Sequence, residues 1–430
     1  MHMAVMPVTK QDFVSLEPFV HQVGGHSSMM KFDDVSVCKP LYQREHRFYE
    51  ELPPEMHPFT PEYRGVVYVS IEEDEDGYIN LTAHPDKLAL ECQNKDGSSK
   101  FSCSTTGSSS DSDSGGEDLV ETGPYRVRLR SGKLELVSTR KDGFFDAGDV
   151  TDHSSGSAGA NPWSLHCHRE EVNKMRKLGP SAKVHKYIVL ENVAYRFSYP
   201  CILDLKMGTR QHGDDATGEK KVRIMAKVEK STSKTLGIRA CGMQVYKKNS
   251  GKFMCRNKYH GLKLHEEGFK QELITFLHNG LQFRTELIEP LLQRLRKLYK
   301  VIEKQHSYRF YSSSLLLMYE GDMENTGETT NSCSCSTKER EKCQSNQEAL
   351  SSNNSCSNLN NICQCFSHRC KVDVRMIDFA HTTHSGFSGD RTRSGPDTGY
   401  LFGLENLIRL LEEIQENYHD SLDTSLDPSP

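Results

Sequence analysis

Pro200-Cys-Ile-Leu-Asp204-Leu-Lys206-Met-Gly208 is the stretch of this 430-residue chain that decides its fold. It follows another apolar, β-branched run at residues 183–192, and both runs have the character of buried strands. Because side chains two apart share one face of a strand, Asp204 and Lys206 project together from the end of an apolar strand. Two interpretations of this pair stay open: a structural ion pair or two reacting groups.

A second apolar strand, residues 372–379, also ends in a carboxylate, in the sequence I-D-F-A-H around Asp378. A carboxylate at the mouth of a buried strand is a hard oxygen ligand that suits Mg²⁺ bridging nucleotide phosphates. The motif resembles the D-F-G of protein kinases with alanine in place of glycine, but no H-R-D catalytic loop occurs, so a protein kinase is not indicated. The chain also has no P-loop and no G-x-G-x-x-G turn.

Charge is distributed unevenly along the chain. Overall, 54 Lys and Arg stand against 59 Asp and Glu, a net charge of −5 that gives no general attraction to nucleic acid. Residues 230–265, in contrast, hold nine Lys or Arg and no Asp or Glu. Four more basic residues lie just upstream along a predicted helix: Lys220, Lys221, Arg223 and Lys227. This region is either a solvated basic face or a local surface for a highly charged anion such as a polyphosphate.

The remaining pattern is strand-rich first and helix-rich later. Apolar runs bounded by turn residues predict strands at 64–71, 183–192, 200–206, 236–246, 308–319 and 372–379. Helical spacing predicts helices around 269–277 and 404–414, and a charged helix at 284–304 with Pro290 as a kink or an early-turn position. The sum predicts an α+β protein of two lobes: a sheet-rich N-lobe and hinge at 16–195, and a C-lobe with the catalytic motifs at 196–420.

Two segments differ sharply in composition from the rest. Residues 96–118 hold nine Ser and five Asp or Glu, including SSSDSDSGGED at 108–118, and residues 321–370 are rich in Ser, Asn and Glu. Neither can bury enough apolar area to offset its chain entropy, so we predict disordered insertions at about 92–160 and about 321–370. Seven of the fourteen cysteines lie in the second insertion, either as a metal site or as thiols in a polar loop, and their spacings match no zinc motif.

Membrane and export signals are absent from the sequence. No run reaches the roughly 18 apolar residues that a membrane helix needs, and the first residues lack the apolar region of an export signal. We therefore expect no membrane span, reduced thiols, and a location in the cytoplasm, the nucleus or both.

A glycine turn is predicted near the N-terminus, in HQVGGHSS at residues 21–28. Two adjacent glycines are typical of a plain hairpin, and a cover over phosphates is the alternative. Lys39 follows on a short apolar strand, where its ammonium group could contact ATP phosphates as a point charge.

Taken together, these motifs resemble a known family. PCILDLKMG at 200–208 matches the P-x-x-x-D-x-K-x-G signature of inositol polyphosphate kinases. HQVGGHSS at 21, NPWSLHCH at 161, TRQHGDDA at 209, RFYSSSLL at 309 and MIDFAHTT at 376 are similar to the inositol hexakisphosphate kinase branch. The resemblance covers about residues 16–85, 161–320 and 371–418.

The resemblance implies a fold distantly similar to protein kinases, with ATP between the N-lobe and a larger C-lobe. Lys39 would contact the nucleotide phosphates, and Glu191 and Val193 would form the hinge that hydrogen-bonds adenine. Asp378 would ligate Mg²⁺. ATP and Mg²⁺ are therefore the implied cofactors.

The resemblance also implies how the acceptor is held. Asp204 would hold the ribose hydroxyls or the reacting edge of the substrate, and Lys206 would bridge the transferring phosphate. The implied substrate-binding residues are Pro200, Asp204, Lys206, Gly208, Arg210, Lys220, Lys221 and Lys258. Related sequences usually carry Arg where this chain has Leu262, followed here by Lys263, and this departure bears on substrate affinity. His381 either touches substrate or caps a strand end.

The implied reaction is ATP-dependent phosphorylation of inositol hexakisphosphate, and of the pentakisphosphate, to diphosphoinositol products. One alternative is a multikinase that phosphorylates hydroxyls of lower inositol phosphates. Another is an interaction protein that binds protein partners through its acidic Ser run. The sequence indicates neither the ring position nor the oligomeric state.

Overall fold

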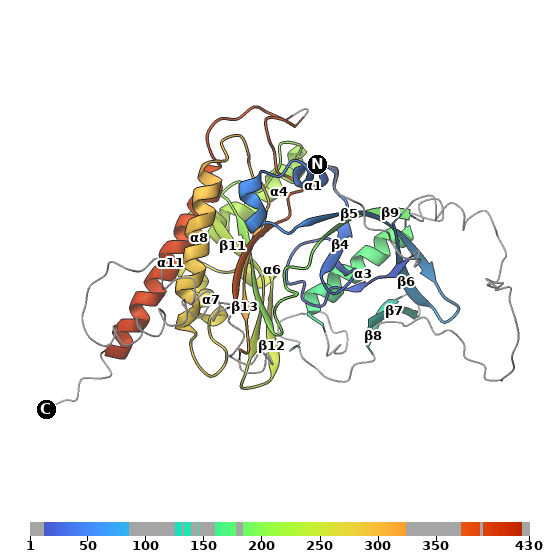
Figure 1. Cartoon of the computed structure of the whole chain (residues 1–430), viewed down its shortest axis with the longest axis horizontal. Helices are drawn as coiled ribbons and strands as arrows, with labels where there is room; N and C mark the ends of the chain where they lie inside the picture. The colour runs from blue at the N-terminus through green and yellow to red at the C-terminus, as the bar shows by residue number, and fades with distance from the viewer. Residues whose placement is uncertain are drawn as a thin grey trace, which may run out of the picture.

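The computed structural model describes residues 13–85, 125–130, 133–138, 145, 160–177, 184–323, 371–387 and 390–423. They form two antiparallel sheets with helices packed on them, which makes an α+β architecture (Figure 1). In the described ranges, no helix combines the length and the apolar character needed to cross a membrane.

The first sheet has nine strands and is built mainly from the N-terminal part of the chain. Its order is β2 (Glu17–Pro18), β3 (Met30–Lys31), β4 (Ser36–Pro40), β9 (Val184–Glu191), β5 (Tyr63–Glu73), β6 (Tyr78–His84), β7 (Tyr125–Arg130) and β8 (Lys133–Ser138), with β1 (Val14–Ser15) paired to β6. Helix α3 (Pro162–Lys177) packs on this sheet, where its Val172 and Met175 share a buried cluster with Val69 and Tyr187. Helix α1 (Gln43–Glu50) and the 3-10 helix η1 (Pro54–Phe59) connect β4 to β5.

The second sheet has five strands and carries the signature stretch at its centre. Its order is β12 (Lys252–Asn257), β11 (Ile238–Lys247), β10 (Pro200–Met207), β13 (Ser314–Glu320) and β14 (Val372–Ile377). Short helices α4 (Gly218–Glu229) and α5 (Thr232–Thr235) lie between β10 and β11, and α6 (Lys258–Gly261) follows β12.

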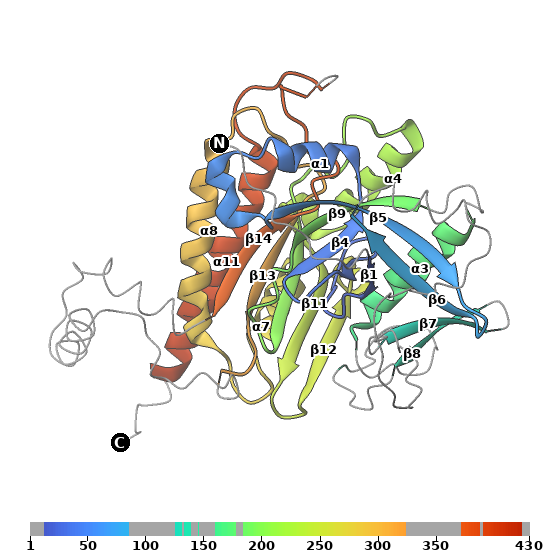
Figure 2. The same cartoon turned by 45° about the vertical axis from the view of Figure 1, so that its right-hand side comes forward.

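Three helices cover the second sheet: α7 (Glu266–Phe276), α8 (Ile288–Glu303) and α11 (Thr398–Asp423). Both views show α8 and α11 side by side (Figures 1 and 2). Their apolar stripes are fully buried in the main core, as the spacing of Leu295, Leu298, Leu404 and Leu411 predicts. The layer therefore leaves the opposite face of the second sheet directed toward the N-lobe.

Most predicted elements are confirmed, and two differ in detail. The strand predicted at 308–319 begins only at Ser314, because residues 310–313 form a turn in which Ser312 has a φ of 61°. The helix predicted at 284–304 is a 3-10 turn η3 (Thr285–Leu287) followed by α8. Pro290 lies in the first turn of α8, where backbone N–H groups have no helical partner, so it is the early-turn position and not a kink.

The predicted insertion at 92–160 is too wide. Strands β7 and β8 lie inside it and extend the first sheet, and the ring of Phe145 stacks on that of Phe253 at 5.0 Å. Arg residues alternate with Val127 and its neighbours in β7, and this charge masked the strand pattern. Residues 86–124, which include the acidic Ser run, and 324–370, which include the seven clustered cysteines, lie outside the described residues.

Candidate functional site

A cleft of about 530 Å³ is lined from both sheets. Apolar side chains form much of its wall: Val37 of β4, Leu190 of β9, Ile202 of β10, Leu316 of β13 and Ile377 of β14. Polar groups gather in the same cleft, among them Lys39, Asp204, Lys206, Lys220 and Asp378. An apolar slot with a few converging charges is the usual form of a small-molecule site.

Strand pairing places the two predicted strand ends at one edge of the sheet. Strand β13 runs antiparallel to both β10 and β14, so these two strands point the same way. Ser314 of β13 pairs with Lys206 on one side and with Ile377, the neighbour of Asp378, on the other. The ladder register therefore brings the ends of the two motifs to the same edge of the sheet.

Asp204 lies at the floor of the cleft and is only 2% exposed. Its Oδ1 atom has no hydrogen-bond partner within the described part of the chain. Burial raises the pKa of this carboxyl to about 6, although the nearby Lys206 ammonium opposes the shift. An unsatisfied buried acceptor is costly unless something else completes it, so Asp204 is suited to receive a donor from a ligand.

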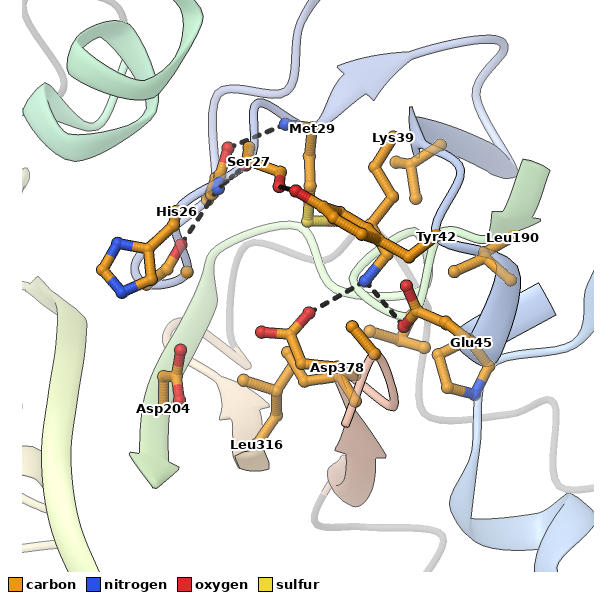
Figure 3. A pocket seen from close by; sticks show the side chains of 18 of the residues that line it. His26, Ser27, Met29, Lys39, Tyr42, Glu45, Leu190, Asp204, Leu316 and Asp378 are labelled. Atoms are coloured by element: carbon orange, nitrogen blue, oxygen red, sulfur yellow. Dashed lines mark hydrogen bonds and ion pairs between the residues drawn. The ribbon is translucent and has the colours of Figure 1, made fainter. Parts of the chain in front are cut away.

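Asp378 and Lys39 form an ion pair across the cleft (Figure 3). The Lys39 Nζ atom lies 2.8 Å from Oδ1 of Asp378 and 3.0 Å from Oε1 of Glu45. Burial acts to raise the pKa of Asp378, but the Lys39 and Lys206 ammonium groups outweigh it and hold the pKa below its usual value. Likewise, burial acts to lower the pKa of Lys39, and Asp378 and Glu45 reverse the shift. Both groups therefore stay charged.

Glu45 is a site residue that sequence reasoning missed. It lies on α1 and is fully buried, with a carboxylate that contacts Lys39 and also accepts a hydrogen bond of 3.0 Å from the backbone N–H of Phe379. It thus fixes both the lysine and the backbone beside Asp378, which has a left-handed φ of 65°. No motif in the sequence of α1 marks this residue, because its role depends on packing against a segment more than 300 residues away.

The glycine turn lies between β2 and β3 and reaches over the C-lobe carboxylates. Gln22 organises it: the side-chain amide donates to the carbonyls of Gly24 and Ser27, and its Oε1 accepts from the N–H of Met29. A Cβ atom at Gly24 would lie 1.8 Å from Oδ2 of Asp204, so only glycine allows this approach. The turn is therefore a cover over the cleft and not a plain exposed hairpin.

The predicted hinge lies at the opposite wall of the cleft. Glu191 and Val193 both line it, but the Glu191 carboxylate is engaged by Arg375, whose Nη1 lies 3.1 Å from Oε2. The backbone N–H of Val193 donates to no residue in the described ranges. The backbone of Val193 is therefore available to a ligand at the hinge, whereas the Glu191 carboxylate is already paired with Arg375.

The predicted substrate-binding residues divide into two groups. Lys206 and Lys220 line the cleft, together with His381, whose Nδ1 lies 3.6 Å from Oδ1 of Asp215. Lys258 lies beside the cleft, with its Nζ 3.3 Å from Nδ1 of His26, a cleft-lining residue of the glycine turn that sequence reasoning did not assign. His381 thus contributes to the wall of the site.

The other predicted substrate residues do not line the cleft. Arg210 donates to the carboxylate of Asp214, and its guanidinium group lies 4.1 Å from the centre of the Tyr311 ring. Pro200 and Gly208 mark the two ends of β10, and Lys221 is exposed on α4. Pro200 and Gly208 shape the strand that carries Asp204 and Lys206, and direct substrate contact by these four residues stays a prediction.

The donor set for a metal ion is small. In the described ranges, no group of three or more His, Cys, Asp or Glu side chains could hold a metal ion. Asp378 supplies a hard carboxylate in the cleft, close to Gly25 of the glycine turn. This arrangement fits Mg²⁺, which keeps several waters and takes one or two protein carboxylates together with substrate phosphates.

Comparisons with known proteins agree with one another. The sequence pattern of a family described as inositol polyphosphate kinase matches residues 187–412. The chain is 48% identical to Homo sapiens inositol hexakisphosphate kinase 1, with 94% of each chain covered. It is 43% identical to Homo sapiens inositol hexakisphosphate kinase 3, covering 94% of this chain and 96% of the relative, and 40% identical to kinase 2, covering 94% and 95%.

Among solved structures, an inositol phosphate multikinase from S. cerevisiae, in complex with ADP and Mn²⁺, shares 24% identity with a TM-score of 0.39, covering 54% of this chain and 84% of its own. A second inositol phosphate multikinase structure shares 21% identity with a TM-score of 0.39, covering 53% and 85%.

Proposed function

The chain belongs to the inositol polyphosphate kinase family, and we propose that it transfers the γ-phosphoryl group of ATP to inositol hexakisphosphate, giving a diphosphoinositol product. The relatives that match nearly the whole chain are named inositol hexakisphosphate kinases, which favours this acceptor over the hydroxyls that a multikinase uses. The observation that carries the proposal is the convergence of Asp204, Lys206 and Asp378 in one cleft. We extend the proposal to the pentakisphosphate as a second acceptor, to Mg²⁺ as the metal, and to a cytoplasmic or nuclear location.

The two ends of the cleft are suited to the two ends of a nucleotide. The apolar wall of Val37, Ile202 and Leu316 can hold the adenine ring, with the open backbone N–H of Val193 as its hydrogen-bond donor. At the other end, Lys39 presents a buried, permanently charged ammonium to the phosphates. Asp378 would hold Mg²⁺, which bridges nucleotide phosphates and neutralises their charge.

The acceptor chemistry is governed by electrostatics. A phosphate oxygen of the hexakisphosphate is already ionised near neutral pH, so the chain needs no strong general base to activate it. The main obstacle is repulsion between two polyanions, which positioned cations must offset. Lys206 and Lys220 inside the cleft, with Lys258 beside it, supply that charge. Lys206 is held by a hydrogen bond to the backbone carbonyl of Ser312, which fixes the direction of its ammonium group.

The test of the acceptor is a side-by-side assay. Purified protein is given ATP and Mg²⁺ with either inositol hexakisphosphate or an inositol trisphosphate that has free hydroxyls. We expect the larger kcat/KM with the hexakisphosphate. A clear preference for the trisphosphate would instead favour the multikinase alternative, and the absence of transfer to any inositol phosphate would favour a binding role.

A further inference from the structure

Trp163 touches two functional parts of the cleft at once. Its side chain is buried at the start of α3, and its indole Nε1 donates a 3.2 Å hydrogen bond to the carbonyl of Gly25 in the glycine turn. The same ring system has the Nζ atom of Lys258 4.7 Å from its centre. A single side chain therefore connects the turn over the carboxylates with the basic group beside the acceptor region.

Further hydrogen bonds from α3 and from Asn161, which precedes it, hold the segment that leads into the turn. The N–H of Asn161 donates to the carbonyl of Val20 at 2.9 Å, and the Ser164 hydroxyl donates to the carbonyl of Phe19 at 2.6 Å. A hydrogen bond of 3.3 Å joins Ser28 to His168 on the far side of the turn. These bonds hold both ends of the turn. At its tip, the Trp163 bond to Gly25 adds to the Gln22 bonds inside the turn and ties the tip to α3.

The position of the turn matters because nothing separates it from the reacting groups. Gly24 lies directly against the Asp204 carboxylate, and a Cβ atom at Gly25 would be 3.9 Å from Oδ2 of Asp378. On the strand beneath, a Cβ atom at Gly242 would lie 1.8 Å from the carbonyl oxygen of Val23. The turn is thus packed without a gap, and a displacement of its tip changes the space left for nucleotide phosphates.

Lys258 is held by aromatic rings and by the imidazole of His26, whose Nδ1 lies 3.3 Å from its Nζ, instead of by a carboxylate. Among the described residues it has no acidic partner, and its ammonium faces the rings of Trp163 and, at 5.4 Å, Tyr259. Its other charged neighbours are cationic groups, Lys227 and Arg239. A cation kept in place by a ring face remains free to receive an anion from outside.

We propose that Trp163 is a positioning residue that couples the two halves of the site: its N–H fixes the glycine turn over the nucleotide phosphates, and its ring holds Lys258 toward the acceptor polyphosphate. The proposal rests on the kinase function proposed above. The indole N–H is assigned to the nucleotide side and the indole ring to the acceptor side. Substitutions can therefore test the two roles separately.

Kinetics of two variants test the separation. Trp163→Phe keeps a ring beneath Lys258 but loses the N–H donor, so we expect kcat to fall about fivefold to tenfold, the range for one lost hydrogen bond, with the KM for hexakisphosphate unchanged. Trp163→Leu loses the ring as well, so the acceptor KM should also rise, by about threefold to tenfold. Lys258→Met should raise the acceptor KM without the fall in kcat that Trp163→Phe produces.

Fluorescence provides a direct readout, because Trp163 is the one tryptophan in the chain. Titration of the protein with hexakisphosphate alone should change the Trp163 emission in a saturable way, because the anion attracts the Lys258 ammonium away from the indole ring. The Lys258→Met variant should show a much smaller change. Emission that is insensitive to hexakisphosphate at concentrations well above the KM would contradict the assignment of the ring.

Hydrogen exchange tests the turn without any substrate. In Trp163→Phe the amides of residues 22–28 should exchange faster than in the wild type, whereas Tyr259→Phe, a neighbouring aromatic change that touches no bond of the turn, should leave them unchanged. Lower thermal stability with unaltered kcat, acceptor KM and turn exchange would show a structural role only and overturn the proposal. If the wild type makes no product from hexakisphosphate but the turn amides exchange faster in Trp163→Phe, the proposed function fails. The role of Trp163 in holding the glycine turn would then still be supported.

Discussion

The C-lobe and N-lobe sides of the cleft hold their charged groups in different ways. Asp204, Lys206 and Asp378 project from strand ends whose relative position is set by a backbone ladder through β13. Lys39 also lies on a paired strand, β4, but its ammonium group is positioned by the Glu45 carboxylate, and the glycine turn is positioned by Gln22 and helix α3. We therefore expect substitutions on the C-lobe side to remove chemistry and leave the fold, and substitutions on the N-lobe side to disturb both.

The largest effect is expected at Lys206. Replacing it by Met removes the cation nearest the transferring phosphate, and kcat should fall by about a hundredfold to a thousandfold, the range for one lost electrostatic contact in a closed site. The melting temperature should change little, because the backbone ladder of β10 does not depend on this ammonium group. Lys297→Met, an exposed position on α8, is the matched control and should retain full activity. Near-wild-type kcat in Lys206→Met would refute its role.

The corresponding change on the N-lobe side should cost stability as well as activity. Lys39→Met leaves the buried Glu45 carboxylate without its cation and removes the partner of Asp378. Breaking a buried ion pair by removing one member costs about 3–5 kcal/mol of unfolding free energy, which chemical denaturation can measure. The double variant Lys39→Met with Glu45→Gln should recover part of this loss without recovering activity. Equal stabilities of the single and double variants would argue against the pair as a structural element.

A smaller effect is expected where the two sides meet. Gly24→Ala places a methyl group against Oδ2 of Asp204, and either the turn or the carboxylate must move. Overpacking of this kind costs about 1–3 kcal/mol of unfolding free energy, and kcat should fall as well. Gly218→Ala is a matched control on α4, where an added Cβ meets nothing within 4 Å, and it should leave stability unchanged or slightly higher.

A change of pH, without any loss of a contact, isolates the contribution of Asp204. Burial raises the pKa of this carboxyl from an ordinary value near 3.8 to about 6, so the fold binds its proton more tightly than the unfolded chain does. The carboxyl therefore costs stability once it ionises, and that cost grows as pH rises from 4 to 6 and is constant above, at about 1.4 kcal/mol per pKa unit. The unfolding free energy of Asp204→Asn relative to the wild type should rise over this range. A difference that stays flat from pH 4 to 7 would contradict the shifted pKa.

The contrast between the two sides also explains what the sequence could predict. Asp204 and Asp378 can be predicted because one lies near the end of an apolar strand and the other directly follows one, and strand periodicity together with the signature motif is a local pattern. Glu45, His26 and Trp163 could not be assigned in the same way, since their roles arise from contacts between distant segments. The indole bond to Gly25, for example, joins residues 138 positions apart.

Amino-acid composition gave a wrong prediction where it disagreed with the local alternation of apolar and polar residues. The Ser-rich composition of residues 96–118 predicts a disordered insertion at about 92–160, although YRVRLR and KLELVS at 125–138 alternate as a hairpin. Similarly, P-x-x-x-D-x-K-x-G identifies the whole strand β10, but only Asp204 and Lys206 of its motif residues line the cleft. Pro200 and Gly208 bound the strand, so a motif marks residues that shape a site as well as those that act in it.

The proposed acceptor is a phosphate group already on the inositol ring. Phosphorus NMR of a reaction containing the purified protein, ATP, Mg²⁺ and inositol hexakisphosphate as the sole acceptor tests it most directly. We predict new resonances of a diphosphate attached to the ring, growing as ATP is converted to ADP and absent with Lys206→Met. ATP hydrolysis without a ring diphosphate, or no change in either compound, would contradict the claim.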